Sequence, residues 1–187
     1  MISRREFTKA SLGVASVAAF GGAWAEPDGM LRKASPSSGE TLPIIGLGTN
    51  RYGVDGSEAA RAPLRAALER FHHLGGTVID TAPMYRTSES VLGDLIAELG
   101  IRADLFIATK TDRTDGSAAT IEQMTESLAR LRTDRVELMQ VHNLLGWRDA
   151  LPVIREWREE GRIRYIGITT TRSSQYAEFE QVMRQEP

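Results

Sequence analysis

The sequence predicts an α/β protein built as an incomplete (β/α)8 barrel, or TIM barrel, with about five strand–helix units behind an N-terminal hairpin. Short apolar runs that suit buried strands alternate with helix-length segments whose apolar residues recur every three or four positions. This alternation is typical of a parallel sheet covered by helices. Polar residues follow three successive strand runs, so we expect them on one face, because the carboxyl ends of parallel strands lie together.

The first elements are expected to be a hairpin and the opening strand of the sheet. Segments 30–35 and 40–44 are joined by the turn-forming sequence Pro36-Ser37-Ser38-Gly39. The first strand of the sheet is expected at 43–49.

Four more strands and five helices follow in alternation. Ser88 is expected to be the N-cap of the second helix, and Gly75, Gly100 and Gly161 are expected to end three of the helices. The expected strands are 77–81, 105–110, 136–142 and 163–169, and the expected helices are 57–74, 88–99, 120–132, 148–160 and 173–184.

The number of units is too small for a closed barrel. Such a barrel needs eight units in about 250 residues, whereas the chain has 187 residues. We expect the N-terminal part of a barrel, or alternatively a short natural half-barrel, with open edges at its first and fifth strands.

Residues 1–25 have the pattern of a twin-arginine export signal. Ser3-Arg4-Arg5-Glu6-Phe7-Thr8-Lys9 precedes an apolar stretch at 10–23 and the small-x-small site Ala23-Trp24-Ala25. The stretch is too short and too rich in Gly, Ala and Ser for a stable membrane anchor, so we expect cleavage after Ala25. This predicts the export machinery as a partner and a periplasmic mature domain, 26–187. The alternative is a basic, disordered terminus.

Composition argues against several other classes of protein. Removing Arg4, Arg5, Lys9 and Glu6, together a net +2, from the total of −2 leaves −4 and no basic run, so nucleic acid is not an expected partner. Cysteine is absent, which excludes disulfides and thiolate chemistry. The three histidines lack metal-ligand spacing, so no metal site is expected.

Four polar residues carry the functional signal. Asp80, Lys110 and His142 each follow a strand run, and Tyr85 lies in the loop after Asp80. In order, spacing and placement they resemble the tetrad of the aldo/keto reductase family. The resemblance extends over about 42–171 and includes Gly46-Leu47-Gly48-Thr49, Ile79-Asp80-Thr81-Ala82-Pro83-Met84-Tyr85 and Gly161-Arg162-Ile163-Arg164-Tyr165-Ile166-Gly167-Ile168.

The resemblance implies an oxidoreductase that reduces aldehyde or ketone carbonyls with a nicotinamide cofactor, NADP(H) or alternatively NAD(H). Tyr85 suits the role of proton donor, since a nearby cation favours the phenolate, and Lys110 would supply that cation. Asp80 would keep Lys110 protonated. His142 would donate a hydrogen bond to the carbonyl oxygen, as the resemblance implies.

The cofactor contacts are likewise implied by the resemblance. Thr49, Asn50, Asp80, Thr169 and Thr170 would face the nicotinamide half of the cofactor. The family often has Ser-Asn where this chain has Thr169-Thr170, so an amide partner of the carboxamide is replaced by hydroxyl groups.

A purely structural role is the alternative for each of the four residues of the tetrad. Asp80 could cap a turn, Lys110 could be a solvated strand end, His142 could satisfy backbone carbonyls, and Tyr85 could serve loop packing. On the whole-protein level, the alternative is an exported non-catalytic binding or accessory protein, or an inactive fragment of a reductase.

Three further residues near the predicted site have expected roles. Glu89 is expected to favour the N-terminus of its helix, whereas Met84 and Trp147 are expected to line a substrate pocket.

Overall fold

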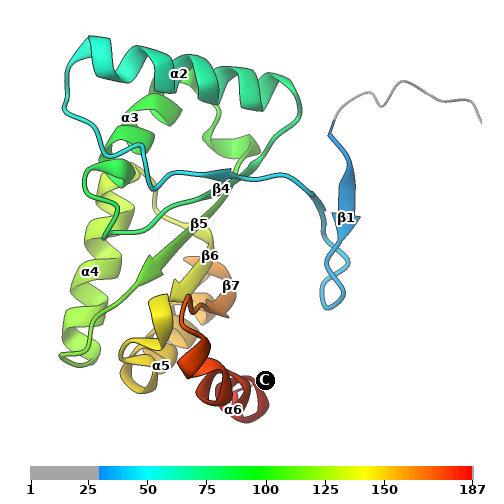
Figure 1. The fold of residues 1–187 in the computed structure, drawn as a ribbon, viewed down its shortest axis with the longest axis vertical. Coiled ribbons are helices and arrows are strands. Elements are labelled where there is room, and N and C mark those ends of the chain that lie inside the picture. The colour runs from blue at the N-terminus through cyan, green and yellow to red at the C-terminus, as the bar shows by residue number, and fades with distance from the viewer. Residues whose placement is uncertain (1–29, 187) are drawn as a thin grey trace, which may run out of the picture.

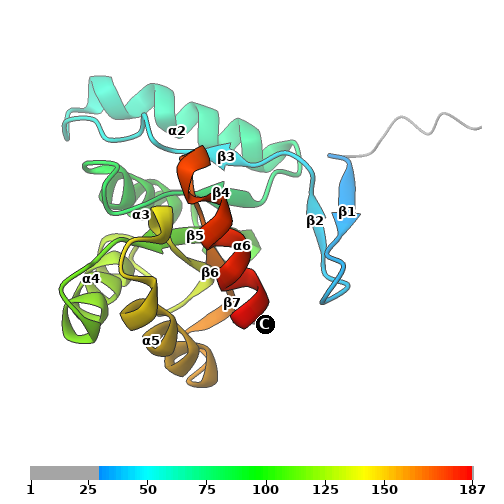
Figure 2. The same ribbon diagram turned by 60° about the horizontal axis from the view of Figure 1, so that its bottom comes forward.

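A computed structural model describes residues 30–186, which form one parallel sheet with helices along its outer side. The five strands of this sheet lie in chain order, and each helix except the last connects two neighbouring strands. Figures 1 and 2 show α2, α3, α4 and α5 following one another along the outside of the curved sheet, with the β1–β2 hairpin standing apart from them. The prediction of an α/β partial barrel is confirmed.

The bounds of most elements agree with the sequence prediction to within a few residues. The strands are β1 (Arg32–Ala34), β2 (Thr41–Pro43), β3 (Leu47–Gly48), β4 (Val78–Asp80), β5 (Phe106–Thr111), β6 (Val136–Val141) and β7 (Ile163–Ile168). The helices are α2 (Glu58–His73), α3 (Ser88–Leu99), α4 (Ser117–Arg130), α5 (Trp147–Glu159) and α6 (Tyr176–Gln185), with short 3-10 turns η1 (Arg102–Asp104), η2 (His142–Leu144) and η3 (Ser173–Gln175).

The apolar run 43–49 is divided between two sheets rather than forming one strand. Ile44 N–H donates to the carbonyl of Leu31 in the hairpin, whereas Thr49 N–H donates to the carbonyl of Asp80 in the parallel sheet. Only Leu47–Gly48 pairs regularly with β4. The expected seven-residue strand is therefore wrong, because its backbone groups serve two different partners.

The hairpin contacts the far end of the parallel sheet. Glu40, in its turn, accepts hydrogen bonds from Arg164 (2.9 Å) and from the hydroxyl of Tyr165 (2.6 Å), both on β7. This contact links the beginning of the described chain to its last strand.

Ser88 does not cap α3, which corrects the expectation from sequence. The N-cap is Thr87, and it makes no side-chain capping bond. The buried Ser88 hydroxyl instead donates to the carbonyl oxygen and to Oγ1 of Thr49, both at 2.9 Å. The hydroxyl is used in tertiary structure because α3 packs its first turn directly against the end of β3.

Helix α4 begins three residues before the expected position, at Ser117, because Gly116 adopts a φ of 98° that L residues avoid.

Helix α4 packs closely against α3. A Cβ on Gly93 of α3 would lie 2.2 Å from the carbonyl oxygen of Arg130, at the end of α4. Glycine is required at this crossing.

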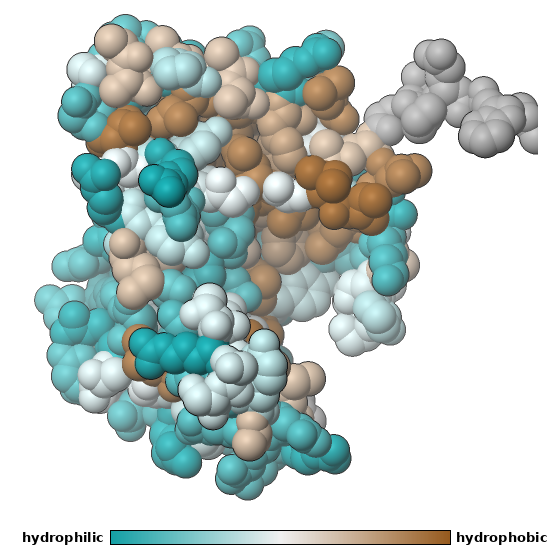
Figure 3. Space-filling model, viewed as in Figure 1, coloured by the Kyte–Doolittle hydropathy of each residue, from teal (hydrophilic) through white to brown (hydrophobic). Residues whose placement is uncertain are grey.

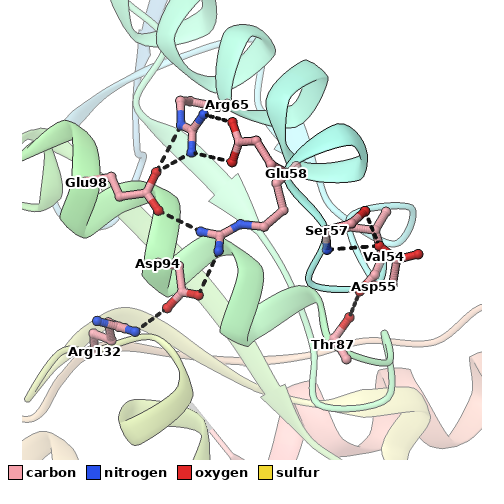
Figure 4. A network of polar contacts seen from close by, with 10 residues as sticks. Val54, Asp55, Ser57, Glu58, Arg65, Thr87, Asp94, Glu98 and Arg132 are labelled. Atoms are coloured by element: carbon pink, nitrogen blue, oxygen red, sulfur yellow. Dashed lines mark hydrogen bonds and ion pairs between the residues drawn. The ribbon is translucent and has the colours of Figure 1, made fainter.

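A network of ion pairs holds α2 against α3 (Figure 4). Arg65 contacts both Glu58 and Glu98, and Arg61 contacts Glu98. Asp94, also on α3, contacts Arg61. These pairs are partly exposed to water, which weakens their charge interactions, so they fix the register of the two helices more than they stabilise the fold.

Large apolar side chains are exposed near the hairpin, including Leu31, Ile44 and Ile45. Figure 3 shows apolar surface concentrated around the hairpin and the adjoining face of the molecule. Within residues 30–186, no helix has the length and apolar character needed to cross a membrane. The predicted export signal lies outside the described residues.

Candidate active site

Asp80 and Lys110 form a bidentate ion pair across neighbouring strands. Asp80 ends β4 and Lys110 is the fifth residue of β5. Lys110 Nζ lies 2.8 Å from each carboxylate oxygen of Asp80 and 2.8 Å from the carbonyl oxygen of Thr81. The three acceptors match the three N–H donors of a lysine ammonium group.

Tyr85 lies beside this pair and beside His142. Lys110 Nζ is 5.1 Å from the centroid of the Tyr85 ring, and the rings of Tyr85 and His142 are 6.1 Å apart in an edge-to-face arrangement. Tyr85 N–H donates to the carbonyl of Ala82, which closes the loop after β4. The structure therefore brings all four residues of the predicted tetrad together at one edge of the sheet.

The loop carrying Tyr85 is packed tightly against the loop after β3. A Cβ on Gly53 would lie 2.6 Å from the carbonyl oxygen of Tyr85, so only glycine fits there. Nearby, the Thr87 hydroxyl donates to the carbonyl of Val54 at 2.7 Å, also visible in Figure 4. These contacts fix the backbone on which the phenol is mounted.

The surroundings of His142 favour its neutral imidazole form. Burial lowers its pKa below the ordinary histidine value, and the positive charge of Lys110 lowers the pKa further, against weaker opposing effects of Asp112 and Asp80. Its Nδ1 is buried without a hydrogen-bond partner among the described residues. A neutral imidazole can donate one hydrogen bond and accept another.

A cavity of about 360 Å³ opens between the ends of β3 and β4. It is lined by Gly48, Thr49, Asn50, Arg51, Asp80 and Tyr85. Of the residues expected to contact a cofactor, Thr49, Asn50 and Asp80 line this cavity together with Tyr85, which suits a ligand placed against the tetrad.

Thr49 is hydrogen-bonded to the end of β4. Its side chain is fully buried, and both its N–H and its hydroxyl donate to the carbonyl oxygen of Asp80, at 3.0 and 2.9 Å. The Ser88 hydroxyl donates to the carbonyl oxygen and to Oγ1 of Thr49. Thr49 thus fixes the backbone of Asp80 with its hydroxyl proton, and its contact with a cofactor stays a prediction.

Thr169 and Thr170 lie directly after β7 and next to the residues that follow His142. The Thr169 hydroxyl accepts a bond from the N–H of Asn143 at 3.1 Å, whereas the Thr170 hydroxyl donates to Gln175 at 2.6 Å. The Thr169 hydroxyl thus keeps its proton for another acceptor.

Sequence reasoning missed Gln140, which lies between Lys110 and Gly167 in the register of the sheet. Its Nε2 is 3.5 Å from Asp80 Oδ1, at the limit of a hydrogen bond. A Cβ on Gly167 would come within 3.0 Å of Gln140 Cγ, so the glycine leaves room for this side chain. The sequence feature that could have indicated Gln140 is a polar residue inside an otherwise apolar strand, two positions before His142.

The expectation that Trp147 lines a substrate pocket is wrong. Trp147 begins α5, is 7% exposed, and donates from Nε1 to Glu178 at 2.9 Å, so it is a core residue rather than a pocket wall. Glu89 lies in the first turn of α3, as expected, and its buried carboxylate also accepts from the Thr109 hydroxyl at 2.6 Å and from Arg130 at 2.8 Å. Met84 is exposed on the loop that carries Tyr85.

The chain matches the model of the aldo/keto reductase family over residues 44–185, which includes the sheet and all four tetrad residues. It belongs to the aldo/keto reductase family. This aldo/keto reductase chain is 34% identical over 157 residues to aldo-keto reductase YhdN of Bacillus subtilis, covering 74% of this chain and 46% of the relative.

Two further comparisons agree with this assignment. The chain is 35% identical over 136 residues to methylglyoxal reductase DkgB of Salmonella typhi, covering 69% of this chain and 48% of that protein. The crystal structure of an aldo-keto reductase from Klebsiella pneumoniae in complex with NADPH superimposes with a TM-score of 0.68 at 29% identity, covering 83% of this chain and 54% of that one. The chain spans about half the length of the curated relatives it matches.

Proposed function

We propose that the protein reduces aldehyde or ketone groups of small molecules with NADP(H), and that Tyr85 is the proton donor. The observation that carries the proposal is the arrangement of Lys110, which is locked to Asp80 at 2.8 Å, beside the ring of Tyr85. A cation beside a phenol favours the negative charge that remains on the phenol oxygen after proton transfer, and Lys110 is placed to supply that cation.

The reaction is balanced by one hydride and one proton. When bound, the reduced nicotinamide supplies the hydride that forms the new C–H bond at the carbonyl carbon. Tyr85 gives its hydroxyl proton to the carbonyl oxygen as the C=O double bond becomes a single bond, and the phenolate that remains is stabilised by Lys110. His142, neutral because burial lowers its pKa, donates a hydrogen bond that orients the carbonyl.

The nicotinamide half of the cofactor would be held by residues around the cavity and at the end of β7. Asn50 and Asp80 line the cavity beside Tyr85. Thr169 has a free hydroxyl proton for the carboxamide oxygen, whereas Thr170 is engaged with Gln175. The Klebsiella pneumoniae neighbour in complex with NADPH favours NADP(H), and NAD(H) is the alternative.

The similarity to a protein named methylglyoxal reductase suggests small aldehydes as first substrates to test. NADPH binding is measured by the change in nicotinamide fluorescence, and turnover by loss of absorbance at the nicotinamide band when methylglyoxal is added. Binding together with aldehyde-dependent oxidation supports the proposal. Neither signal would favour the non-catalytic binding or accessory protein.

We further propose that residues 1–25 direct twin-arginine export and that the mature chain begins at Glu26 in the periplasm. The support is the sequence pattern of Arg4-Arg5, the weakly apolar stretch and Ala23-Trp24-Ala25. Replacing both arginines with lysine should retain the protein in the cytoplasm. Undiminished periplasmic protein in the fractionated cells would contradict the assignment.

A further inference from the structure

Asn143, the residue after His142, joins the ends of β6 and β7. Its Oδ1 accepts hydrogen bonds from the N–H and the hydroxyl of Thr171, at 3.1 and 3.2 Å. Its own N–H donates to the hydroxyl of Thr169 at 3.1 Å. The side chain and the backbone N–H of Asn143 therefore hold the two ends of the segment 169–171.

The backbone around Asn143 takes a conformation that L residues rarely adopt. Asn143 and Leu144 have φ values of 53° and 56°, in the left-handed region. Asparagine tolerates this region, but leucine does so only where the surroundings impose it. Here the N–H of Leu144 donates to the carbonyl of Thr169 at 3.1 Å, so the unusual turn serves to bring this chain segment onto the end of β7.

Gln175 completes the connection. Its Nε2 donates to the carbonyl of Asn143 at 3.0 Å, and its Oε1 accepts from the hydroxyl of Thr170 at 2.6 Å. The hydroxyls of Thr169, Thr170 and Thr171 are thus each bonded to Asn143 or to Gln175. We call this connection, made by Asn143, Gln175 and the three threonines, the β6–β7 strap.

We propose that Asn143 is a positioning residue that sets the affinity for the cofactor through the β6–β7 strap. The inference rests on the proposed function, in which Thr169 faces the nicotinamide half. A loop held in its binding conformation before the ligand arrives loses less entropy on binding, so the strap raises affinity. It also places His142, one residue from Asn143, in a fixed relation to Thr169.

The strap acts on binding more than on proton transfer, because Asn143 makes no contact with Tyr85 or Lys110 among the described residues. Replacing Asn143 should therefore weaken cofactor binding more than it slows the reaction at saturating cofactor. Asn143→Gly keeps the left-handed backbone and removes the Oδ1 acceptor. Asn143→Asp keeps both the left-handed backbone and the Oδ1 acceptor, so its cofactor affinity should be much closer to that of the wild-type protein.

The matched control is Arg132→Gly. Arg132 also has a left-handed φ, 53°, but lies at the end of α4, away from the tetrad. Any effect of glycine on the unfolded chain is therefore shared by the two variants.

The experiment combines NADPH titration by fluorescence, steady-state reduction of methylglyoxal, and amide hydrogen exchange. Asn143→Gly should raise the Kd for NADPH about tenfold, the scale expected for two lost hydrogen bonds in a preorganised loop, with a smaller fall in kcat. The N–H of Thr171 should exchange faster in that variant. Asn143→Asp and Arg132→Gly should stay near the wild-type Kd.

The outcomes separate this inference from the proposed function. If wild-type protein binds NADPH and Asn143→Gly binds it equally well, the inference fails and the proposed function stands. If kcat falls more than affinity, Asn143 acts on the chemical step and the positioning role is wrong. If wild-type protein binds no NADPH, both fail, even where exchange at Thr171 shows that the strap orders the loop.

Discussion

Lys110 and Asp80 share a bidentate ion pair but differ sharply in their access to water. Nζ of Lys110 lies 2.8 Å from both carboxylate oxygens of Asp80. The side chain of Lys110 is 6% exposed, whereas that of Asp80 is 42% exposed. The buried partner therefore depends on the exposed one more than the reverse. Loss of the carboxylate leaves an ammonium in the sheet edge, but loss of the ammonium leaves a carboxylate that water can reach.

This asymmetry predicts that Asp80→Asn destabilises the fold more than Lys110→Met. An uncompensated buried charge costs several kcal/mol, and the partial exposure of Asp80 reduces this to a difference of about 2 kcal/mol between the variants. Unfolding in urea, followed by circular dichroism at pH 7, measures both. Equal destabilisation would show that Lys110 is solvated or neutral in the folded protein.

Arg130 and Glu89 form an ion pair in which the carboxylate, rather than the cation, is the buried partner. Glu89 is 1% exposed and Arg130 is 29% exposed, and Arg130 also contacts Glu126. Arg130→Met should cost roughly 3 kcal/mol because it leaves a buried carboxylate, whereas Glu89→Gln should cost less, since the guanidinium keeps Glu126 and water. Urea midpoints for the two variants decide the order, and a larger loss for Glu89→Gln would contradict it.

Tyr52 has a buried hydroxyl with no hydrogen-bond partner among the described residues, and burial raises its pKa. Removing an unsatisfied buried hydroxyl should not destabilise the protein. Tyr52→Phe should be neutral or stabilising by about 1 kcal/mol. A clear fall in the thermal midpoint would mean that the hydroxyl has a partner, such as ordered water.

His142 should make stability depend on pH. Burial, and then Lys110, lower its pKa in the folded state, so below the unfolded value of about 6.5 the unfolded chain binds a proton that the folded chain does not. Proton binding to His142 in the unfolded chain therefore has no effect on stability above about pH 6.5, and it destabilises the folded protein increasingly as the pH falls below that value. Wild-type protein should lose more thermal stability between pH 7.5 and 5 than His142→Gln. Parallel pH profiles would contradict the lowered pKa.

The sequence was sufficient for the parts of the site set by strand periodicity. Asp80, Lys110 and His142 follow apolar runs, so their shared edge could be predicted from the parallel sheet alone. The uses of hydroxyl groups could not be predicted. Ser88 has the sequence context of an N-cap, and its actual bond to Thr49 depends on how α3 approaches β3.

The same limit applies to residues whose role depends on neighbouring strands. Gln140 was missed because its contact with Asp80 requires the register of three strands and the absence of a side chain at Gly167. Trp147 was assigned to a pocket because it follows a loop, but its indole bonds to Glu178, 31 positions later. Long-range pairing of this kind leaves no periodic signal in the sequence.

Tyr85 is the residue proposed to donate the proton during carbonyl reduction. Tyr85→Phe keeps the ring beside Lys110 and His142 and removes only the hydroxyl. In protein shown to bind NADPH, kcat for methylglyoxal reduction should fall by at least roughly 100-fold with the Kd for NADPH little changed. Reduction at near wild-type rates by Tyr85→Phe would contradict the account and would leave His142 as the better candidate for the acid.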